Sequence, residues 1–156
     1  MVSYNKKIQG PPIPIEDFFK LCESGTFKEV QAAIKSGVNV NAKNEYGVTA
    51  LMFAVERNED REVVKVLINA GADVNAEDES NKTPLMYASQ YCKNEKIVKL
   101  LLRSRAEINA RNKYGEISLM LGAWNANSEV TKLLIQAGAE LNVQDSHGRT
   151  SLMKAA

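Results

Sequence analysis

The sequence predicts an all-α solenoid, in which antiparallel helix pairs stack in one direction and β-turn or hairpin loops project from the stack. The first observation is an asparagine that recurs at positions 41, 75, 109 and 142, with spacings of 34, 34 and 33 residues. The second is a Leu-Met pair that begins at positions 51, 85, 119 and 152 with the same spacings. A period of roughly 20 to 50 residues indicates a repeat architecture.

The third observation is the apolar character of the second helix predicted in each repeat. Residues 63–68 and residues 97–102 each contain five apolar side chains, and residues 130–135 contain four. A helix that is apolar on so much of its surface must be covered on two sides. A stack of neighbouring repeats provides that cover, whereas a lone helix pair does not.

The chain begins with a segment that has no helical pattern. Residues 1–12 lack periodicity and end in Pro11-Pro12, which favours an extended, flexible leader. From residue 13 onward the apolar residues fall at helical spacing, and Gly37 ends the second helix of this unit. Residues 13–43 are therefore predicted to form an N-terminal capping repeat, the first unit of a domain spanning 13–156.

Three full repeats follow at residues 44–77, 78–111 and 112–144, and residues 145–156 form a partial repeat. A threonine is predicted to cap the first helix, because its oxygen can accept a bond from the first turn. Pro84 follows at the first helical position, where its missing N–H does no harm. The capping threonines are Thr49, Thr83 and Thr150, and the predicted helix-ending glycines are Gly37, Gly71 and Gly138.

Three positions depart from this pattern. Arg105 replaces the helix-ending glycine, and we expect it to adopt a left-handed backbone at a cost of about 1 kcal/mol. Asn81 replaces a turn glycine, a change that turns tolerate. Ile117 occupies the capping-threonine position, and Ser118 is the candidate cap one residue later.

Composition limits the classes of partner. The 156 residues are 44% hydrophobic and 25% charged, with 20 basic and 19 acidic residues, so no excess charge suits nucleic acid or an anionic membrane surface. No apolar run reaches the ~20 residues of a membrane span. We expect a cytoplasmic protein, although the sequence leaves open a secreted effector. Cys22 and Cys92 lie two repeats apart, too far for a predicted disulfide.

Two motifs resemble those of ankyrin repeats. They are Gly-Ala-Asp-Val-Asn-Ala at residues 71–76 and Thr-Pro-Leu at residues 83–85, and the match runs from about residue 13 to the C-terminus. The resemblance implies an L-shaped stack of helix pairs whose concave face binds proteins. One departure is methionine where the family usually has a histidine after Thr-Pro-Leu, which predicts a soft apolar contact between repeats.

Signals for catalysis are weak. His147 is the sole histidine, and Asp145-Ser146-His147 is a triad only in composition, because triads depend on geometry and not on adjacency. Two distant cysteines and one histidine do not suggest zinc, and no phosphate-binding loop is present. We therefore expect no enzyme activity and no cofactor.

Recognition is the remaining function, and its candidates are side chains that vary between equivalent repeat positions. The family resemblance places such positions on the turns and at the ends of the first helices, and aromatic residues with polar tips often anchor protein interfaces. Trp124 could equally pack between repeats, and Asn125 follows it in the same set. The predicted partner-binding residues are Glu45, Tyr46, Arg57, Glu79, Lys82, Tyr91, Arg111, Lys113, Tyr114, Trp124 and His147.

Two functions follow as hypotheses. The first is a scaffold that binds an unidentified protein partner on the concave face. The alternative is a structural or self-associating module, or a fragment of a longer array, because Leu152 and Met153 begin a helix with no second helix after it. We expect a monomer under the first hypothesis and end-to-end association under the second.

Overall fold

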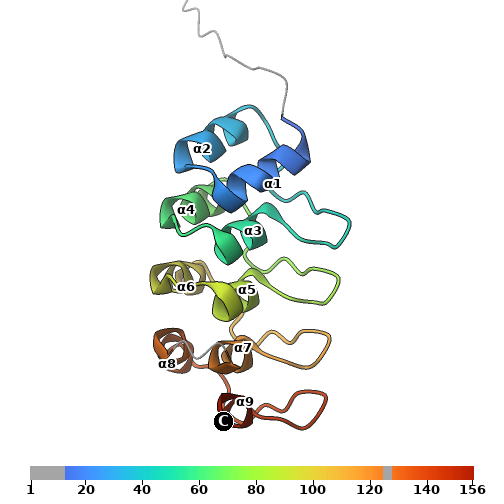
Figure 1. Ribbon diagram of the computed structural model, residues 1–156, viewed down its shortest axis with the longest axis vertical. Helices are drawn as coiled ribbons and strands as arrows, with labels where there is room; N and C mark the ends of the chain where they lie inside the picture. The colour runs from blue at the N-terminus through green and yellow to red at the C-terminus, as the bar shows by residue number, and fades with distance from the viewer. Residues whose placement is uncertain (1–12, 125–127) are drawn as a thin grey trace, which may run out of the picture.

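The computed structural model describes residues 13–124 and 128–156 of the chain. The predicted leader, residues 1–12, and Asn125 lie outside these described residues. The described residues form helices that follow one another down the stack in chain order (Figure 1). They are α1 (Ile15–Ser24), α2 (Phe27–Lys35), α3 (Ala50–Arg57), α4 (Arg61–Asn69), α5 (Pro84–Tyr91), α6 (Glu95–Arg103), α7 (Ser118–Trp124), α8 (Ser128–Gln136) and α9 (Ser151–Ala155).

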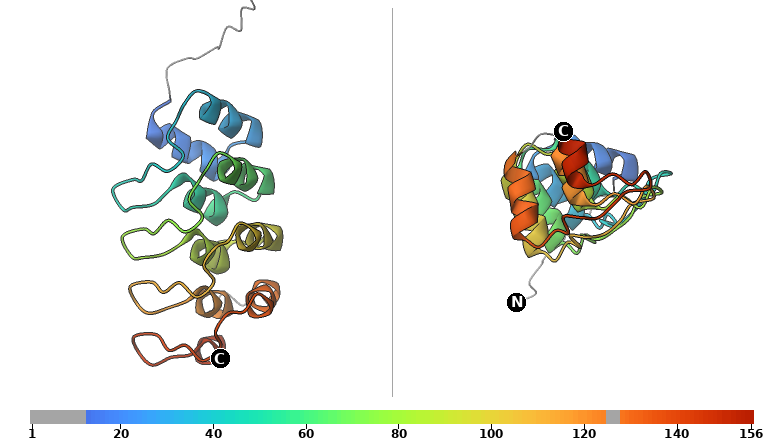
Figure 2. Two further views of the ribbon diagram at one scale, coloured as in Figure 1. Left: turned by 180° about the vertical axis from the view of Figure 1, so that it is seen from behind. Right: turned by 90° about the horizontal axis from the view of Figure 1, so that it is seen from below.

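The helices form two layers with loops on one side. Helices α1, α3, α5, α7 and α9 form the inner layer, next to the projecting loops, and α2, α4, α6 and α8 form the outer layer (Figures 1 and 2). In the described ranges the loops contain one isolated antiparallel bridge, between Lys43 and Thr49, so they are turns and not extended strands. The predicted all-α solenoid is confirmed.

The inner helices begin as the threonine pattern predicts. The hydroxyl oxygen of Thr49 accepts a hydrogen bond from the backbone N–H of Met52 at 3.4 Å, and Thr83 and Thr150 make the equivalent bond. Pro84 is the first residue of α5. The predicted caps are therefore confirmed at three of the four inner helices that follow a projecting loop.

Helix α7 is the exception, and there the predicted cap is wrong. Ser118 is the first residue of α7, and its hydroxyl oxygen is buried with no hydrogen-bond partner among the described residues. Ile117 keeps the capping position and is fully buried. The position within the repeat, and not the presence of a nearby capping residue, therefore decides where this helix starts.

The outer helices end at residues with a left-handed backbone. Gly37, Gly71 and Gly138 have φ angles of 97°, 91° and 95°, and Arg105 has a φ of 67°. This confirms the left-handed conformation predicted for Arg105. The backbone of Arg105 therefore holds a conformation that glycine adopts more easily.

The core runs along the whole stack between the two layers. Three of the four recurring methionines, Met52, Met86 and Met120, are fully buried, as the predicted apolar contact between repeats requires. Met153 is 62% exposed, so the prediction is wrong at this position. Cys22 and Cys92 are both buried, and burial raises the pKa of the Cys22 thiol to about 12.

Three of the four recurring asparagines each join their repeat to the next through two hydrogen bonds. The Asn75 side-chain amide donates to the carbonyl of Arg105 at 3.2 Å, and its oxygen accepts from the backbone N–H of Glu107 at 2.8 Å. Asn41 makes the same two bonds to the following repeat, and so does Asn109. This junction explains the period in the sequence.

Candidate functional site

Each projecting loop is held by one side chain at its first turn. The Asn44 side-chain oxygen accepts hydrogen bonds from the backbone N–H groups of Tyr46 and Val48, both at 2.9 Å. Such a bond mimics a backbone turn. The same arrangement recurs with Asp78, Asn112 and Asp145.

The loops are also bonded to one another near their tips. The backbone N–H of Glu79 donates to the carbonyl of Tyr46 at 3.0 Å, and equivalent bonds join Lys113 to Ser80 and Ser146 to Tyr114. The loops therefore form a row of fixed spacing, which is visible from both sides of the stack (Figure 2). Side chains on this row are held in position before any partner arrives.

Two of the predicted aromatic residues lie at these tips. Tyr46 is 61% exposed and Tyr114 is 50% exposed. Each immediately precedes a glycine with positive φ, Gly47 or Gly115. The two rings are presented to solvent on rigid turns.

The other two predicted aromatic residues line a cavity at the ends of the inner helices. Tyr91 is the last residue of α5 and Trp124 is the last residue of α7. Together with Gln90 and Leu121 they surround a cavity of about 240 Å³. The structure thus brings Tyr91 and Trp124 to one cavity and leaves Tyr46 and Tyr114 on the loops.

Several of the predicted charged residues already have partners within the protein. An Arg57 Nη1 donates to Glu23 Oε1 at 2.5 Å, and Lys82 Nζ donates to Gln90 Oε1 at 3.0 Å. Arg111 donates to the carbonyl of Gln144 at 2.6 Å. A partner protein that used these cations would have to share or break those bonds.

The remaining predicted charges are open to solvent. Glu45, Glu79 and Lys113 are exposed on the loops and make no ion pair within the described part of the chain. His147 is exposed, and its ring Nδ1 lies 3.3 Å from the Ser146 hydroxyl. These side chains remain predicted partner contacts.

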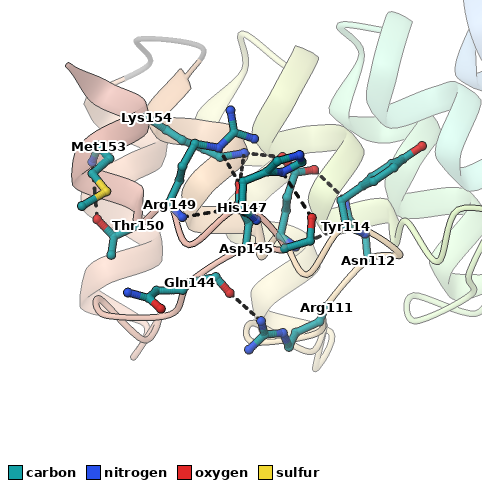
Figure 3. Close-up of polar contacts among 12 residues, drawn as sticks. Arg111, Asn112, Tyr114, Gln144, Asp145, His147, Arg149, Thr150, Met153 and Lys154 are labelled. Atoms are coloured by element: carbon teal, nitrogen blue, oxygen red, sulfur yellow. Dashed lines mark hydrogen bonds and ion pairs between the residues drawn. The ribbon is translucent and has the colours of Figure 1, made fainter.

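The structure also contains a buried charge cluster that sequence reasoning missed (Figure 3). Lys154 Nζ contacts the Glu116 carboxylate and lies 3.3 Å from Asp145 Oδ2, with the lysine side chain 5% exposed. Arg149 Nε donates to Asp145 Oδ2 at 2.9 Å. The available signal was repeat register, because Lys154 occupies the position of Phe53, an apolar residue, in an earlier repeat.

The cluster lowers the pKa of both carboxyl groups. Burial alone would raise the pKa of Asp145, but hydrogen bonds from Arg149, His147 and Lys154 outweigh it and hold the pKa well below its ordinary value. Burial alone would also raise the pKa of Glu116, but hydrogen bonds from Lys154 and Asn112 outweigh it and lower this pKa. Both carboxylates are therefore charged at neutral pH, and they stabilise the last junction.

The geometry around His147 is that of a turn. Asp145 accepts from the backbone N–H of His147 at 2.8 Å and does not contact its ring nitrogens. Across residues 13–124 and 128–156, no cluster of three or more histidine, cysteine or acidic residues could hold a metal ion. Over the same residues, every helix is too short or too polar to span a membrane.

Two sequence profiles match the chain. One, described as ankyrin repeats (3 copies), covers residues 18–112, and the other, described as ankyrin repeats (many copies), covers residues 93–135. No curated protein matches the chain. The first profile spans more than half of the sequence and coincides with the helix pairs described above. The chain therefore belongs to the ankyrin repeat family, whose repeats are general modules for protein–protein interaction.

Proposed function

We propose that this chain is a non-catalytic scaffold that holds a partner protein on its concave face, the surface formed by the inner helices and the projecting loops. One observation carries the proposal: Tyr91 and Trp124 flank a cavity on the inner helices, while Tyr46 and Tyr114 stand on loops of fixed spacing. Aromatic side chains lose little conformational freedom on binding and dominate interface energetics. Four such rings on one repeat surface suit a protein partner.

The supporting physical argument is rigidity. The loops are tied internally by asparagine or aspartate side chains and externally by backbone bonds between repeats. A surface that is already ordered loses less entropy on association than a mobile one.

The proposed compartment is the cytoplasm, because the buried free thiol of Cys22 suits a reducing environment. Fractionation of the source cells tests this, and recovery from the medium would favour the secreted alternative.

The test compares proteins recovered from native lysate by the wild-type chain and by the double variant Tyr114→Ala, Trp124→Ala. Quantitative mass spectrometry should find proteins that the wild type retains and the variant loses, with about a tenfold loss for an anchor pair. Helical circular dichroism should be unchanged, because both rings are at least half exposed. A Lys96→Ala variant on outer helix α6 is the matched control and should retain the same proteins.

A partner retained equally by the double variant and the wild type would place binding elsewhere on the molecule. In that case the concave-face proposal fails even though the chain is a binding protein. Loss of the same partner in the Lys96→Ala control would instead identify the outer helices as the binding surface.

One observation favours self-association as a second candidate function. Leu152 is 80% exposed and Met153 is 62% exposed on α9, and a second copy of the chain could cover both. Light scattering tests this candidate: a mass that rises with concentration, and that Leu152→Glu returns to the monomer value, supports it. A monomeric mass at all concentrations rejects it.

A further inference from the structure

We infer that the concave face accepts a partner segment in which a bulky apolar side chain neighbours a basic side chain. This inference rests on the proposed scaffold function and specifies the chemistry of the partner. It places the apolar side chain in the cavity between Tyr91 and Trp124. It places the basic side chain in a second recess on the other side of Tyr91.

The first cavity suits one bulky apolar group. Its volume is about 240 Å³ and its walls are the Tyr91 and Trp124 rings with Leu121, which is buried. The Trp124 ring is 68% exposed, and Tyr91 is 42% exposed. An apolar side chain placed here would remove both rings from water, which is the main source of affinity at protein interfaces.

Gln90 adds a directed hydrogen-bond donor to this cavity. Lys82 Nζ lies 3.0 Å from Gln90 Oε1, and an ammonium group can only donate, so the amide oxygen must face Lys82. The NH₂ group of Gln90 is left without an internal acceptor among the described residues. It can therefore donate to a backbone carbonyl of a bound segment.

The second recess is lined by carboxylates. It has a volume of about 190 Å³, shares Tyr91 with the first cavity, and includes Glu56, Arg57, Glu59 and Lys93 in its lining. Glu23, just outside, binds Arg57 through the bond described above, and Glu56 forms a second, longer ion pair with the same guanidinium. Glu59 makes no ion pair in the described residues. Burial raises the pKa of Tyr91, and the negative charge of Glu56 raises it further.

The balance of these charges favours a cation as the occupant. Arg57 is shared between Glu23, at 2.5 Å, and Glu56, at 3.8 Å. The three carboxylates of Glu23, Glu56 and Glu59 therefore exceed the two cations, Arg57 and Lys93, by one negative charge. Because Tyr91 forms a wall of both spaces, two neighbouring side chains of a single segment can reach them. An acidic or wholly apolar segment would leave this excess negative charge without a counter-charge.

The experiment selects random dodecapeptides displayed on phage against the immobilised full chain, and then measures each synthetic peptide by quenching or enhancement of Trp124 fluorescence. Trp124 is the sole tryptophan, so the signal reports this cavity directly. The enriched peptides should share a Leu, Met or Phe next to an Arg or Lys, and peptides that contain Trp are left out of the fluorescence assay. Replacing the apolar residue of the peptide by Ala should weaken binding at least tenfold.

The protein variants test each half of the site. Tyr91→Ala should weaken binding about tenfold, and Glu56→Gln with Glu59→Gln about two- to fivefold, with the second effect shrinking as salt is added. Exchanging the peptide's basic residue for Gln should make the peptide insensitive to the double Gln variant. This peptide-side change does not depend on the folding of any protein variant.

The outcomes separate this inference from the proposed function. Enriched peptides without an apolar–basic pair, or with affinities unchanged by Tyr91→Ala, overturn the inference. If those same peptides lose affinity with Tyr46→Ala and Tyr114→Ala, concave-face binding stands and only the segment chemistry is wrong. If neither the loop variants nor the cavity variants change affinity, both proposals fail.

Discussion

At the scale of single residues, Arg105 shows how one side chain can oppose the conformation that its position requires. Every other described outer helix is followed by a glycine with positive φ, and Arg105 holds the same conformation at φ 67°. In this conformation the carbonyl of Arg105 accepts a hydrogen bond from the side-chain amide of Asn75 in the preceding repeat. Tertiary contact therefore overrides the local preference.

We predict that Arg105→Gly stabilises the protein by about 1 kcal/mol, because the backbone conformation is kept and the steric cost is removed. Urea unfolding followed by circular dichroism should show a higher midpoint. Lys99→Gly, which places glycine within α6, is the matched control and should lower the midpoint by a similar amount. An unchanged midpoint in Arg105→Gly would show that Arg105 is not strained.

Lys154 illustrates the opposite case, in which one residue satisfies two buried carboxylates. Changing Lys154 to Met removes the shared cation, and we predict a loss of about 3 kcal/mol from the Lys154–Glu116 pair. The double variant Glu116→Val, Lys154→Tyr introduces the residues found at the equivalent positions of the first junction, Val48 and Tyr87, and should recover most of this loss. Urea unfolding monitored by Trp124 fluorescence measures both, and equal instability of single and double variants would contradict the pairing.

At the scale of the element, the junction between repeats depends on one asparagine. We predict that Asn75→Ala lowers the free energy of unfolding by about 1 to 2 kcal/mol, because two hydrogen bonds to the next repeat are lost. Faster amide exchange at Glu107 would locate the loss.

Asn142→Ala is the matched control, since Asn142 is exposed and its side chain makes no hydrogen bond in the described structure. This control should change stability by less than about 0.5 kcal/mol. Similar losses in both variants would mean that the asparagine acts within its own repeat.

Elements with local signals were predictable from the sequence, and the polar side-chain contacts that depend on packing were not. Thr49 correctly predicted a helix start and Gly71 a helix end, because capping depends on residues a few positions apart. Ser118 misled, since capping chemistry alone cannot show that register places it inside α7. The Lys82–Gln90 and Lys154–Glu116 bonds join side chains whose proximity follows from packing and not from spacing.

At the scale of the whole molecule, the stack is a linear series of contacts in which each repeat touches only its neighbours. The described inner helices contact one another in order from α1 to α9, and no single centre organises the fold. In such arrays stability is approximately a sum of repeat and junction contributions. A local change can therefore unfold one end before the rest.

Acid should unfold the C-terminal junction first. The pKa values of Asp145 and Glu116 are lower in the folded state than their ordinary values of 3.8 and 4.5, so the unfolded chain binds more protons as the pH falls. Their contribution is full above about pH 5 and is lost progressively below it as the pH approaches the folded-state pKa values.

Titration from pH 7 to pH 2 should show the Trp124 fluorescence change at a higher pH than the loss of helical circular dichroism. Trp124 reports the cluster because Lys154 Nζ lies 5.7 Å from its ring centroid. In Glu116→Val, Lys154→Tyr the two transitions should move closer together. Coincident transitions in the wild-type chain would show that the cluster does not control the acid response.

The repeated asparagine junction has a further consequence for how such a chain can change its length during evolution. Because Asn41, Asn75 and Asn109 use the same atoms on equivalent partners, duplication or excision of one 34-residue unit would leave matching surfaces on both sides. The Glu116–Lys154 contact breaks this interchangeability, because its two members have no charged counterparts at the first junction. Recombination is therefore tolerated in the first part of the array, while the order of the last two units is fixed by charge.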